Sequence, residues 1–401
     1  MIAGWDARLT DAVVRPTSAA EPRGRLPGVS DSVTVPLNYA QRNGKTIMRR
    51  RNSTSKVLTA VALLALVTTV RSGGQAGQAD GRLDLYFIDS EGGGSLLIVT
   101  PLGESVLVDS GYPGFDNRDR DRILHVVRDV AKLDHLDHSV VTHWHLDHFV
   151  NLPAVAACVR IDHFWDRGLP EPLPENQRFR EQIAAYRAVT RNQSKRLRAG
   201  DRLPLRSGSP PLVMWFVAGS REVIPNEGSP NPFASLHRPK PEDKSENAES
   251  LCFLLTFGRF RFLHCADLTW NIEAKLVTPN NPLGQVDLFM VTHHGLPLSN
   301  NPVLVWAVDP RVAIMCNGPT KGGHPDVIKT IREVKSLQAL YQLHRNIRLP
   351  AEQQAPPEFI ANKEPTEQCP GVFIKVAVAP DGESYRVQIG ERGRPRTYRT
   401  R

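Results

Sequence analysis

The stretch His143-Trp144-His145-Leu146-Asp147-His148 places three imidazoles and one carboxylate within six residues. It follows the apolar run at 139–141, which is typical of a buried strand. Side chains two residues apart at a strand end point the same way, so we expect the first two histidines to bind one divalent ion. The Asp-His pair that follows is expected to face a second ion, about 3.5–4 Å away. Imidazole and carboxylate ligands suit zinc and similar cations, so the sequence predicts a metal centre here.

Other apolar runs in the chain also end in polar residues. The polar residues that end these runs are, in order, Asp109 within Asp109-Ser110-Gly111, Asp267, and His293-His294-Gly295. With the six-residue stretch, and in this order, they resemble the metallo-β-lactamase superfamily over about residues 83–390. The opening strand at 86–89, the glycine turn at 92–95 and the His-His-Gly element further resemble one branch of it. That branch includes the extracellular hydrolase domain of bacterial DNA-uptake (competence) channels.

The resemblance implies an α/β fold, namely a four-layered αββα sandwich with mixed sheets. It also implies that His143 and His145 hold a first ion, while Asp147 and His148 hold a second ion or orient the attacking water. Asp267 would bridge the ions, because a carboxylate has two oxygens. The implied cofactor is zinc, as one or two divalent ions, with manganese or iron as alternatives. Asp109 is expected to orient a ligand histidine rather than to bind metal.

The remaining histidines leave the ligand set open. Adjacent side chains diverge on an extended backbone, so His293 is expected as a ligand and His294 as a proton donor or oxyanion contact. His324, in a Lys-Gly-Gly-His-Pro stretch, resembles the branch's Gly-His-Pro element and is expected at or beside the ligands. Asn247 and Ser250 resemble an Asn-x-x-Ser element that positions the loop or the substrate. The best-known members of the superfamily place another ligand histidine between the main motif and the bridging aspartate. The candidates for that position are His163, His237 and His264, and none of them stands in a matching sequence context. The centre is therefore expected to hold one ion or two.

The N-terminal part of the chain reads as a leader. Residues 1–47 lack periodicity and are expected to be a disordered extension or to precede the true start at Met48. A basic cluster, a 14-residue apolar run and small residues follow, so 48–79 is expected to be a signal peptide and the protein secreted or periplasmic. A membrane anchor is the alternative. The hydrolase domain is expected at 80–390, followed by a basic tail at 391–401.

The charge distribution argues against a large polyanionic partner. Residues 1–56 and 391–401 contribute +6 and +4 to the formal net charge of +8, which leaves −2 on 57–390. A nucleic-acid-binding domain usually carries the basic excess itself. The expected partner is therefore a small-molecule or phosphodiester substrate, with nucleic acid not favoured. No integral membrane domain is expected apart from the leader.

Periodicity predicts most of the secondary structure. Strands are expected at 83–88, 96–100, 105–108, 140–142, 251–256, 260–263, 286–291, 312–316, 372–379 and 385–389, and helices at 119–132, 175–192, 269–275, 303–308 and 325–334. The Pro/Glu/Lys-rich residues 225–250 are expected to be a mobile loop that borders the site. The five cysteines single out no disulfide, and their odd number leaves at least one thiol free.

These patterns predict a metal-dependent hydrolase in which a metal-bound hydroxide attacks an ester, amide or phosphodiester, with Asp147 and His294 as catalytic residues. Three alternatives remain: a β-lactamase, a thiolesterase-type hydrolase, and a non-catalytic metal-binding envelope protein that retains the fold. The incomplete ligand set motivates the last of these. A His143→Ala substitution that removes both the metal and the activity would exclude it.

Overall fold

The computed structural model describes residues 78–364 and 369–401. The predicted extension at 1–47 and almost all of the predicted leader at 48–79 lie outside these residues. In the described part of the chain no helix has the length and apolar character needed to cross a membrane.

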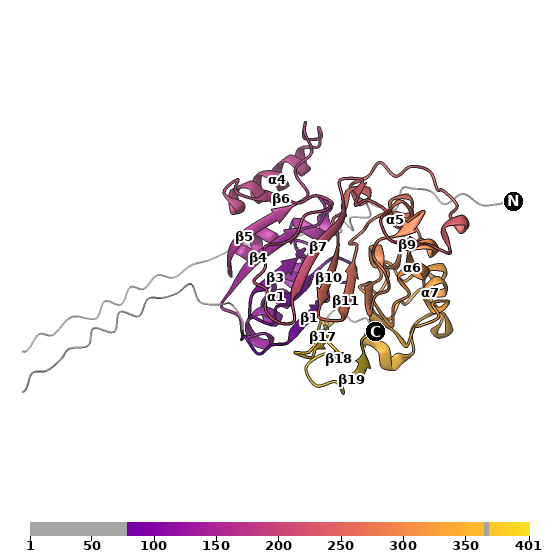
Figure 1. The fold of residues 1–401 in the computed structure, drawn as a ribbon. Coiled ribbons are helices and arrows are strands. Elements are labelled where there is room, and N and C mark those ends of the chain that lie inside the picture. Colours follow the sequence, from indigo (N-terminus) through magenta and orange to yellow (C-terminus); the bar gives the residue numbers. More distant parts are fainter. Residues whose placement is uncertain (1–77, 365–368) are drawn as a thin grey trace, which may run out of the picture. The chain divides into compact units, whose positions relative to one another are not determined.

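Two mixed β-sheets form the middle of the fold (Figure 1). Within the described residues, the first sheet has nine strands in the order β19 (Arg396–Arg399), β18 (Ser384–Ile389), β17 (Ile374–Val378), β1 (Leu83–Phe87), β2 (Leu96–Val99), β3 (Ser105–Val108), β4 (His135–Val141), β5 (Arg160–Asp166) and β6 (Lys195–Arg196). Strands β3 to β6 are parallel and the others pair antiparallel.

The second sheet has eight strands among the residues described. Their order is β16 (Ile360–Asn362), β15 (Ala339–His344), β14 (Val312–Met315), β13 (Leu288–Met290), β11 (Phe260–His264), β10 (Cys252–Phe257), β7 (Leu212–Gly219) and β8 (Glu222–Val223). Its strands β11, β13, β14, β15 and β16 are parallel, so their carboxyl ends lie at one edge of the sheet. Strands β9 (Ser229–Pro230) and β12 (Asn280–Asn281) form a separate small pair.

The central core lies between the two sheets. Phe87 of β1 packs edge-on against Phe262 of β11 at 5.8 Å, and Phe260 of β11 packs against Tyr385 of β18 at 5.2 Å. Central strands are buried on both faces, which explains why they read as continuous apolar runs. Burial of so many side chains between the sheets makes this layer the main apolar core of the domain.

Helices cover the outer face of each sheet. Those on the first sheet are α1 (Arg118–Leu124), which continues into the π-helical turn η2 (His125–Val130), α3 (Leu152–Ala156) and α4 (Gln177–Thr190). Those on the second sheet are α5 (Trp270–Val277), α6 (Pro302–Val308) and α7 (Pro325–Arg332). Figure 1 shows α5, α6 and α7 grouped on one side. The predicted four-layered αββα sandwich is confirmed.

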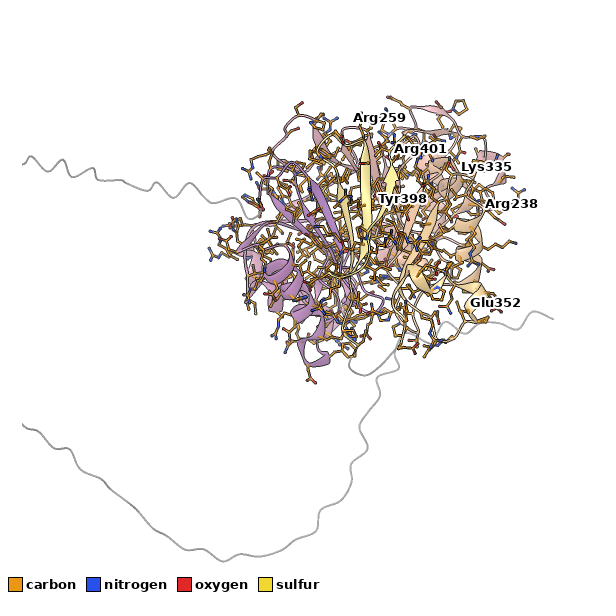
Figure 2. The ribbon with its side chains drawn as sticks, turned by 90° about the horizontal axis from the view of Figure 1, so that it is seen from below. Arg238, Arg259, Lys335, Glu352, Tyr398 and Arg401 are labelled. Carbon is orange, nitrogen blue, oxygen red and sulfur yellow. A yellow bond between two sulfur atoms is a disulfide. The ribbon has the colours of Figure 1, made fainter. Side chains whose placement is uncertain are left out.

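Within the predicted basic tail at 391–401, Arg396–Arg399 form an edge strand of the first sheet. Strand β19 pairs with β18, and its buried Tyr398 shares a hydrogen bond of 2.8 Å with the hydroxyl of Tyr341. The backbone N–H of Arg401 donates to Asp287, and Arg259 donates to the Arg401 carbonyl (Figure 2). Alternation of exposed arginines with the buried Tyr398 explains why the composition of this strand resembles that of a tail.

Nine of the strands in the described residues were not predicted, and the longest of these are β5, β7 and β15. Strand β5 is largely polar and exposed over its first half, so it lacks the apolar pattern of a core strand. Among the cysteines, Cys252 and Cys265 form a disulfide, because β10 and β11 pair antiparallel with Phe253 opposite His264. Cys158, Cys316 and Cys369 are free.

Candidate metal centre

The six-residue histidine stretch forms the turn between β4 and the short helix α2 (Leu146–Phe149). The side chains of His143, Asp147 and His148 are buried, whereas His145 is partly exposed. The site is therefore built below the surface and reaches solvent near His145. Because β4 is parallel to its neighbours β3 and β5, this turn lies at the carboxyl edge of that part of the first sheet.

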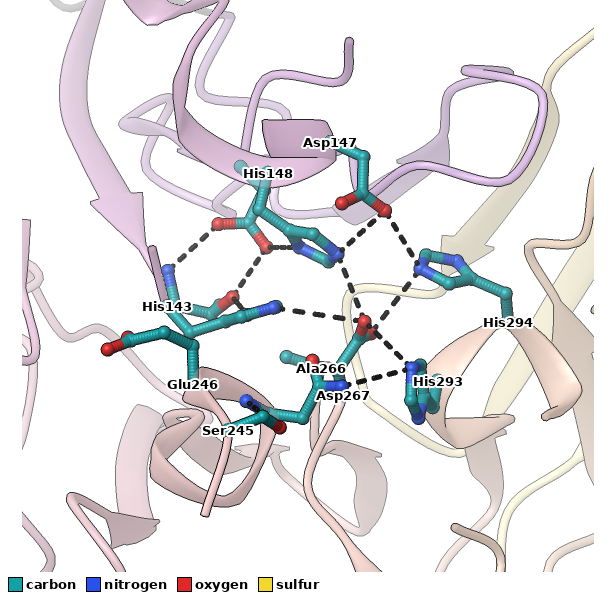
Figure 3. Close-up of polar contacts among 12 residues, drawn as sticks. His143, Asp147, His148, Ser245, Glu246, Ala266, Asp267, His293 and His294 are labelled. Atoms are coloured by element: carbon teal, nitrogen blue, oxygen red, sulfur yellow. Dashed lines mark hydrogen bonds and ion pairs between the residues drawn. The ribbon is translucent and has the colours of Figure 1, made fainter. Parts of the chain in front are cut away.

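The second sheet delivers the facing residues from two of its strand ends. Asp267 follows β11, and the turn η5 (Thr292–Gly295) follows β13. The N–H of His293 donates to the carbonyl of Ala266 at 2.8 Å, which ties the two loops together. All these polar side chains therefore meet at the edge shared by the two sheets (Figure 3).

His293 and His294 both point towards Asp267, although adjacent side chains on an extended chain would diverge. Both residues are in the left-handed region, with φ of 53° and 54°. As a result, Nε2 of His293 lies 3.5 Å from Oδ2 of Asp267, and Nε2 of His294 lies 3.4 Å from its Oδ1. Nε2 of His294 also lies 3.5 Å from Oδ2 of Asp147. The extended backbone behind the predicted division of roles is therefore absent.

At this centre, two groups of side chains offer potential ligand atoms that lie within 4.8 Å of one another. The larger group is Asp147, His148, Asp267 and His294; the smaller is His143, His145 and Asp267. Asp267 belongs to both, which places it where a bridging carboxylate would stand. His293 is in neither group, despite its contact with Asp267.

Four ligand atoms of the centre are buried without a hydrogen-bond partner among the described residues. They are Nε2 of His143, His148 and His294, and Oδ1 of Asp267. Buried polar atoms are normally paired, and each unpaired one costs free energy. Imidazole nitrogens and a carboxylate oxygen that lie this close together without other partners fit a divalent cation.

The other ring nitrogen of each of these histidines is held by a neighbour. Nδ1 of His148 lies 2.8 Å from Oδ2 of Asp109, and Nδ1 of His294 lies 3.1 Å from the carbonyl oxygen of Cys316. Nδ1 of His143 lies 3.1 Å from the hydroxyl of Thr142. Partners at Nδ1 fix the ring orientation and leave Nε2 for a ligand, as in metal-binding histidines generally.

The charge of the centre is dominated by carboxylates. Burial lowers the pKa of His148, yet Asp267, Asp147 and Asp109 together raise it well above its usual value. Burial lowers the pKa of His143 well below its usual value and that of His293 to about 4. His143 and His293 are therefore neutral at neutral pH, which is the form that donates to a metal or accepts a proton.

The remaining predicted residues lie around this cluster. Asp109 accepts bonds from the backbone N–H and hydroxyl of Thr142, besides its contact with His148. The amide nitrogen of Asn247 lies 3.4 Å from Nε2 of His293, and Ser250 is buried at the end of the same turn, just before β10. Residues 246–249 form a turn that Arg167 holds through Glu246 and Glu249 rather than a wholly irregular loop.

His324 does not join the cluster. It caps the N-terminus of α7, where its Nδ1 accepts from the N–H of Asp326, and its side chain is partly exposed. Its loop instead supports the site through the backbone, since the N–H of His324 donates to the carbonyl of Gly295. The intermediate-ligand candidates also lie apart: His264 stacks on Phe253, His163 on His138, and His237 contacts Asn301.

Lys321 and Tyr112 are site residues that sequence reasoning missed. The Lys321 ammonium lies 2.5 Å from Oδ2 of Asp147 and 3.0 Å from the Tyr112 hydroxyl. Burial lowers the pKa of Lys321, but the Asp147 carboxylate outweighs this effect and the net shift is upward. Lys321 belongs to the Lys-Gly-Gly-His-Pro stretch, in which only His324 was predicted to be a site residue.

Residues 91–220 match the family model described as the Metallo-beta-lactamase superfamily. No curated protein matches the chain. A solved variant of the CmlA beta-hydroxylase is 16% identical over 65% of this chain and 52% of its own, with a TM-score of 0.40, so the chain spans about half of that relative.

Two further solved structures are similar to the chain. One, from Parabacteroides distasonis, is described as a metal-dependent hydrolase and is 14% identical over 66% of this chain and 93% of its own, with a TM-score of 0.35. The other is a metallo-beta-lactamase mutant from Cronobacter sakazakii, 14% identical over 51% of this chain and 74% of its own, with a TM-score of 0.29. Likenesses this distant carry no argument about activity. Residues 91–220 thus match the family model of that superfamily, and the two mixed sheets with helices on their outer faces are consistent with its fold.

Proposed function

We propose that this protein is a metal-dependent hydrolase. One observation carries the proposal: unpartnered Nε2 atoms of three buried histidines and one oxygen of Asp267 share the same polar space. An inert scaffold gains nothing from leaving these atoms unpaired, because their burial lowers the stability of the fold. A centre that takes up a cation recovers this loss and places the cation at the end of two sheets, where the loops admit a substrate.

The two groups of side chains suggest which residues hold the ions. His143, His145 and Asp267 would hold one ion, and Asp147, His148, His294 and Asp267 the other. In contrast to the sequence prediction, we assign His294 rather than His293 as a ligand. Imidazole with carboxylate suits zinc first, with manganese or iron as alternatives. When bound, such ions lower the pKa of a water molecule and polarise the carbonyl or phosphoryl group of a substrate.

The protein's own residues would orient the ligands and move the proton. Asp109 fixes the ring of His148, and Lys321 fixes the carboxylate of Asp147. With Asp147 engaged by Lys321, proton transfer falls to His293, whose neutral ring lies beside Asp267 and is held by Ser299 at Nδ1. A neutral imidazole next to the ligands can take a proton at Nε2 and return it to the leaving group.

The substrate is expected to be an ester, an amide or a phosphodiester. The likeness of the His-His-Gly and Gly-His-Pro elements to the DNA-uptake branch supports a phosphodiester, whereas the charge of −2 on residues 57–390 speaks against a long nucleic acid. We also propose export through the 48–79 leader. N-terminal sequencing of protein recovered from the medium or the periplasm would test that point.

Metal content tests the hydrolase proposal directly. The full chain, its Asp267→Ala variant and the control Asp326→Ala, whose side chain is exposed, would be analysed for bound metal and for hydrolysis of bis(p-nitrophenyl) phosphate and p-nitrophenyl acetate. We expect about two equivalents of metal in wild type and control, one or fewer in Asp267→Ala, and a parallel loss of hydrolysis. Metal uptake without hydrolysis of either substrate would favour the non-catalytic alternative.

A further inference from the structure

Five large apolar side chains are more than a third exposed among the described residues. They are Phe115 at 64%, Leu146 at 36%, Leu236 at 50%, Leu298 at 53% and Ile347 at 49%. Single exposed apolar residues are ordinary on a protein surface, so their number alone decides nothing. Their positions are informative: two of the five stand on loops that carry candidate ligands, and two more stand on loops that contact Tyr112 or the segment before Lys321.

Leu146 and Leu298 are next to the ligands in the chain. Leu146 lies between His145 and Asp147 in the ligand turn itself. Leu298 precedes Ser299, whose hydroxyl lies 3.2 Å from Nδ1 of His293. These two leucines therefore come from the two facing sides of the centre, one from each sheet.

Phe115 and Ile347 are tied to the centre through Lys321. The ring of Phe115 packs edge-on against Tyr112 at 6.2 Å, and the Tyr112 hydroxyl lies 3.0 Å from the Lys321 ammonium. The N–H of Ile347 donates to the carbonyl of Pro319, two residues before Lys321. We call Phe115, Leu146, Leu298 and Ile347 the apolar rim.

The apolar rim is paired with a cation. Lys321 bonds to Asp147 and Tyr112, and an ammonium has three donors, so one donor is left for an anion. Its side chain is 32% exposed, so it is reached from solvent as well as from the centre. Apolar side chains around a metal centre that also offers a cation are complementary to an anionic group that carries a hydrocarbon chain or ring.

We propose that the apolar rim and Lys321 select amphiphilic substrates, in which an acyl or aryl group adjoins the hydrolysed bond and an anionic group. This inference rests on the proposed hydrolase function and names its substrate class. In the reaction the oxygen of water bonds to the acyl carbon or phosphorus, the bond to the leaving oxygen breaks, and that oxygen takes the proton. The products are an acid and an alcohol, and the apolar group stays on one of the two.

Binding measurements test the proposal without any turnover. Alkylphosphonates with two to ten carbons would be titrated into the full chain by calorimetry. We expect the Kd to fall roughly fourfold for each added methylene until the rim is covered. In Phe115→Ser and Leu298→Ser this dependence on chain length should weaken, whereas Lys321→Gln should raise the Kd at all lengths. The matched control is Leu236→Ser, an equally exposed leucine with no described contact to the centre, which should behave as wild type.

The outcomes separate this proposal from the hydrolase function. If the Kd depends on alkyl chain length but no ester is hydrolysed, the apolar rim binds amphiphiles as proposed and the hydrolase function is wrong. A Kd that is independent of chain length would overturn the rim. If rim substitutions leave alkylphosphonate binding unchanged but abolish binding to phosphatidylglycerol vesicles, the rim is a membrane contact, and the substrate proposal is wrong. Thermal melts of each variant check that these exposed substitutions leave the fold intact.

Discussion

Oδ2 of Asp109 lies 2.8 Å from Nδ1 of His148, at the base of the metal centre. Asp109 is itself held by the N–H and hydroxyl of Thr142, so its carboxylate has little freedom to turn. The chain of contacts therefore runs from Thr142, just after β4, through Asp109 to His148, which faces both Asp147 and Asp267. Ring orientation at His148 is thus set by a residue that binds no metal.

Asp109→Asn is expected to weaken metal binding while the fold is retained. An amide carries no charge to support the imidazole, and loss of such a partner typically lowers metal affinity 10–100-fold. Competition with a chromogenic chelator measures the change. The control is Asp134→Asn, which alters another Asp-His contact, with His135, away from the centre. Equal affinity in wild type and Asp109→Asn would show that His148 needs no such support.

Gly322→Ala is expected to destabilise the protein and to displace His294. Gly322 has a φ of +76°, and a Cβ there would lie 2.0 Å from the carbonyl oxygen of His294. Left-handed strain and the backbone clash together should cost at least about 3 kcal/mol of unfolding free energy. Urea denaturation measures the loss. In the control Gly200→Ala, φ is +99° and the space is open, so only the strain of about 1 kcal/mol remains.

Stability is expected to fall between pH 4.5 and 7 because of Glu273. Burial raises the pKa of this carboxyl from 4.5 to about 7. In that interval the folded protein retains a proton that the unfolded chain has released, so unfolding becomes easier as pH rises; below pH 4.5 both states are protonated and the penalty vanishes. The full effect is of the order of 3 kcal/mol.

Denaturation of metal-free protein at pH 4.5 and pH 7.5 measures the Glu273 effect. Glu273→Gln should remove most of the difference, since a carboxamide does not titrate. Glu333→Gln, at an exposed position, should leave it unchanged. A difference of the same size in Glu273→Gln would assign the pH dependence to other groups.

Tyr398→Ala is expected to lower the free energy of unfolding by about 2–3 kcal/mol. The ring is buried against the core and its hydroxyl bonds to Tyr341, so its loss leaves a cavity and an unpaired polar group. Arg399→Ala, on the exposed face of the same strand, should change stability by less than about 0.5 kcal/mol. Equal effects of both substitutions would mean that residues 391–401 do behave as a tail.

The sequence was most informative where neighbours in the chain are neighbours in space. The ligand turn at 143–148 needs only a strand and a helix start, and central strands such as β1 and β10 are recognisable from their apolar runs. The αββα order of layers followed from the family resemblance. Strand β5 was missed because half of it is exposed, and pattern methods need a buried face.

Long-range contacts set the details of the site that could not be predicted. The left-handed turn at His293 and His294 depends on Gly322 and Gly323, which approach its carbonyl from nearly thirty residues away. Lys321 reaches Asp147 across 174 positions of sequence. Neither relationship leaves a local periodicity, so the roles of the two histidines and the presence of a cation at the centre had to come from the structure.

The centre also draws its ligands from both sheets. His143 and His148 follow β4 of the first sheet, whereas Asp267 and His294 follow β11 and β13 of the second. A cation bound there fastens the loop ends of two sheets whose contact is otherwise mainly apolar, with a few hydrogen bonds such as that between Tyr341 and Tyr398. Neither sheet alone offers a full ligand set, so bound metal indicates that the two sheets are correctly docked. By mass action the ion stabilises only the docked pair, and chelation should loosen the domain along this seam first.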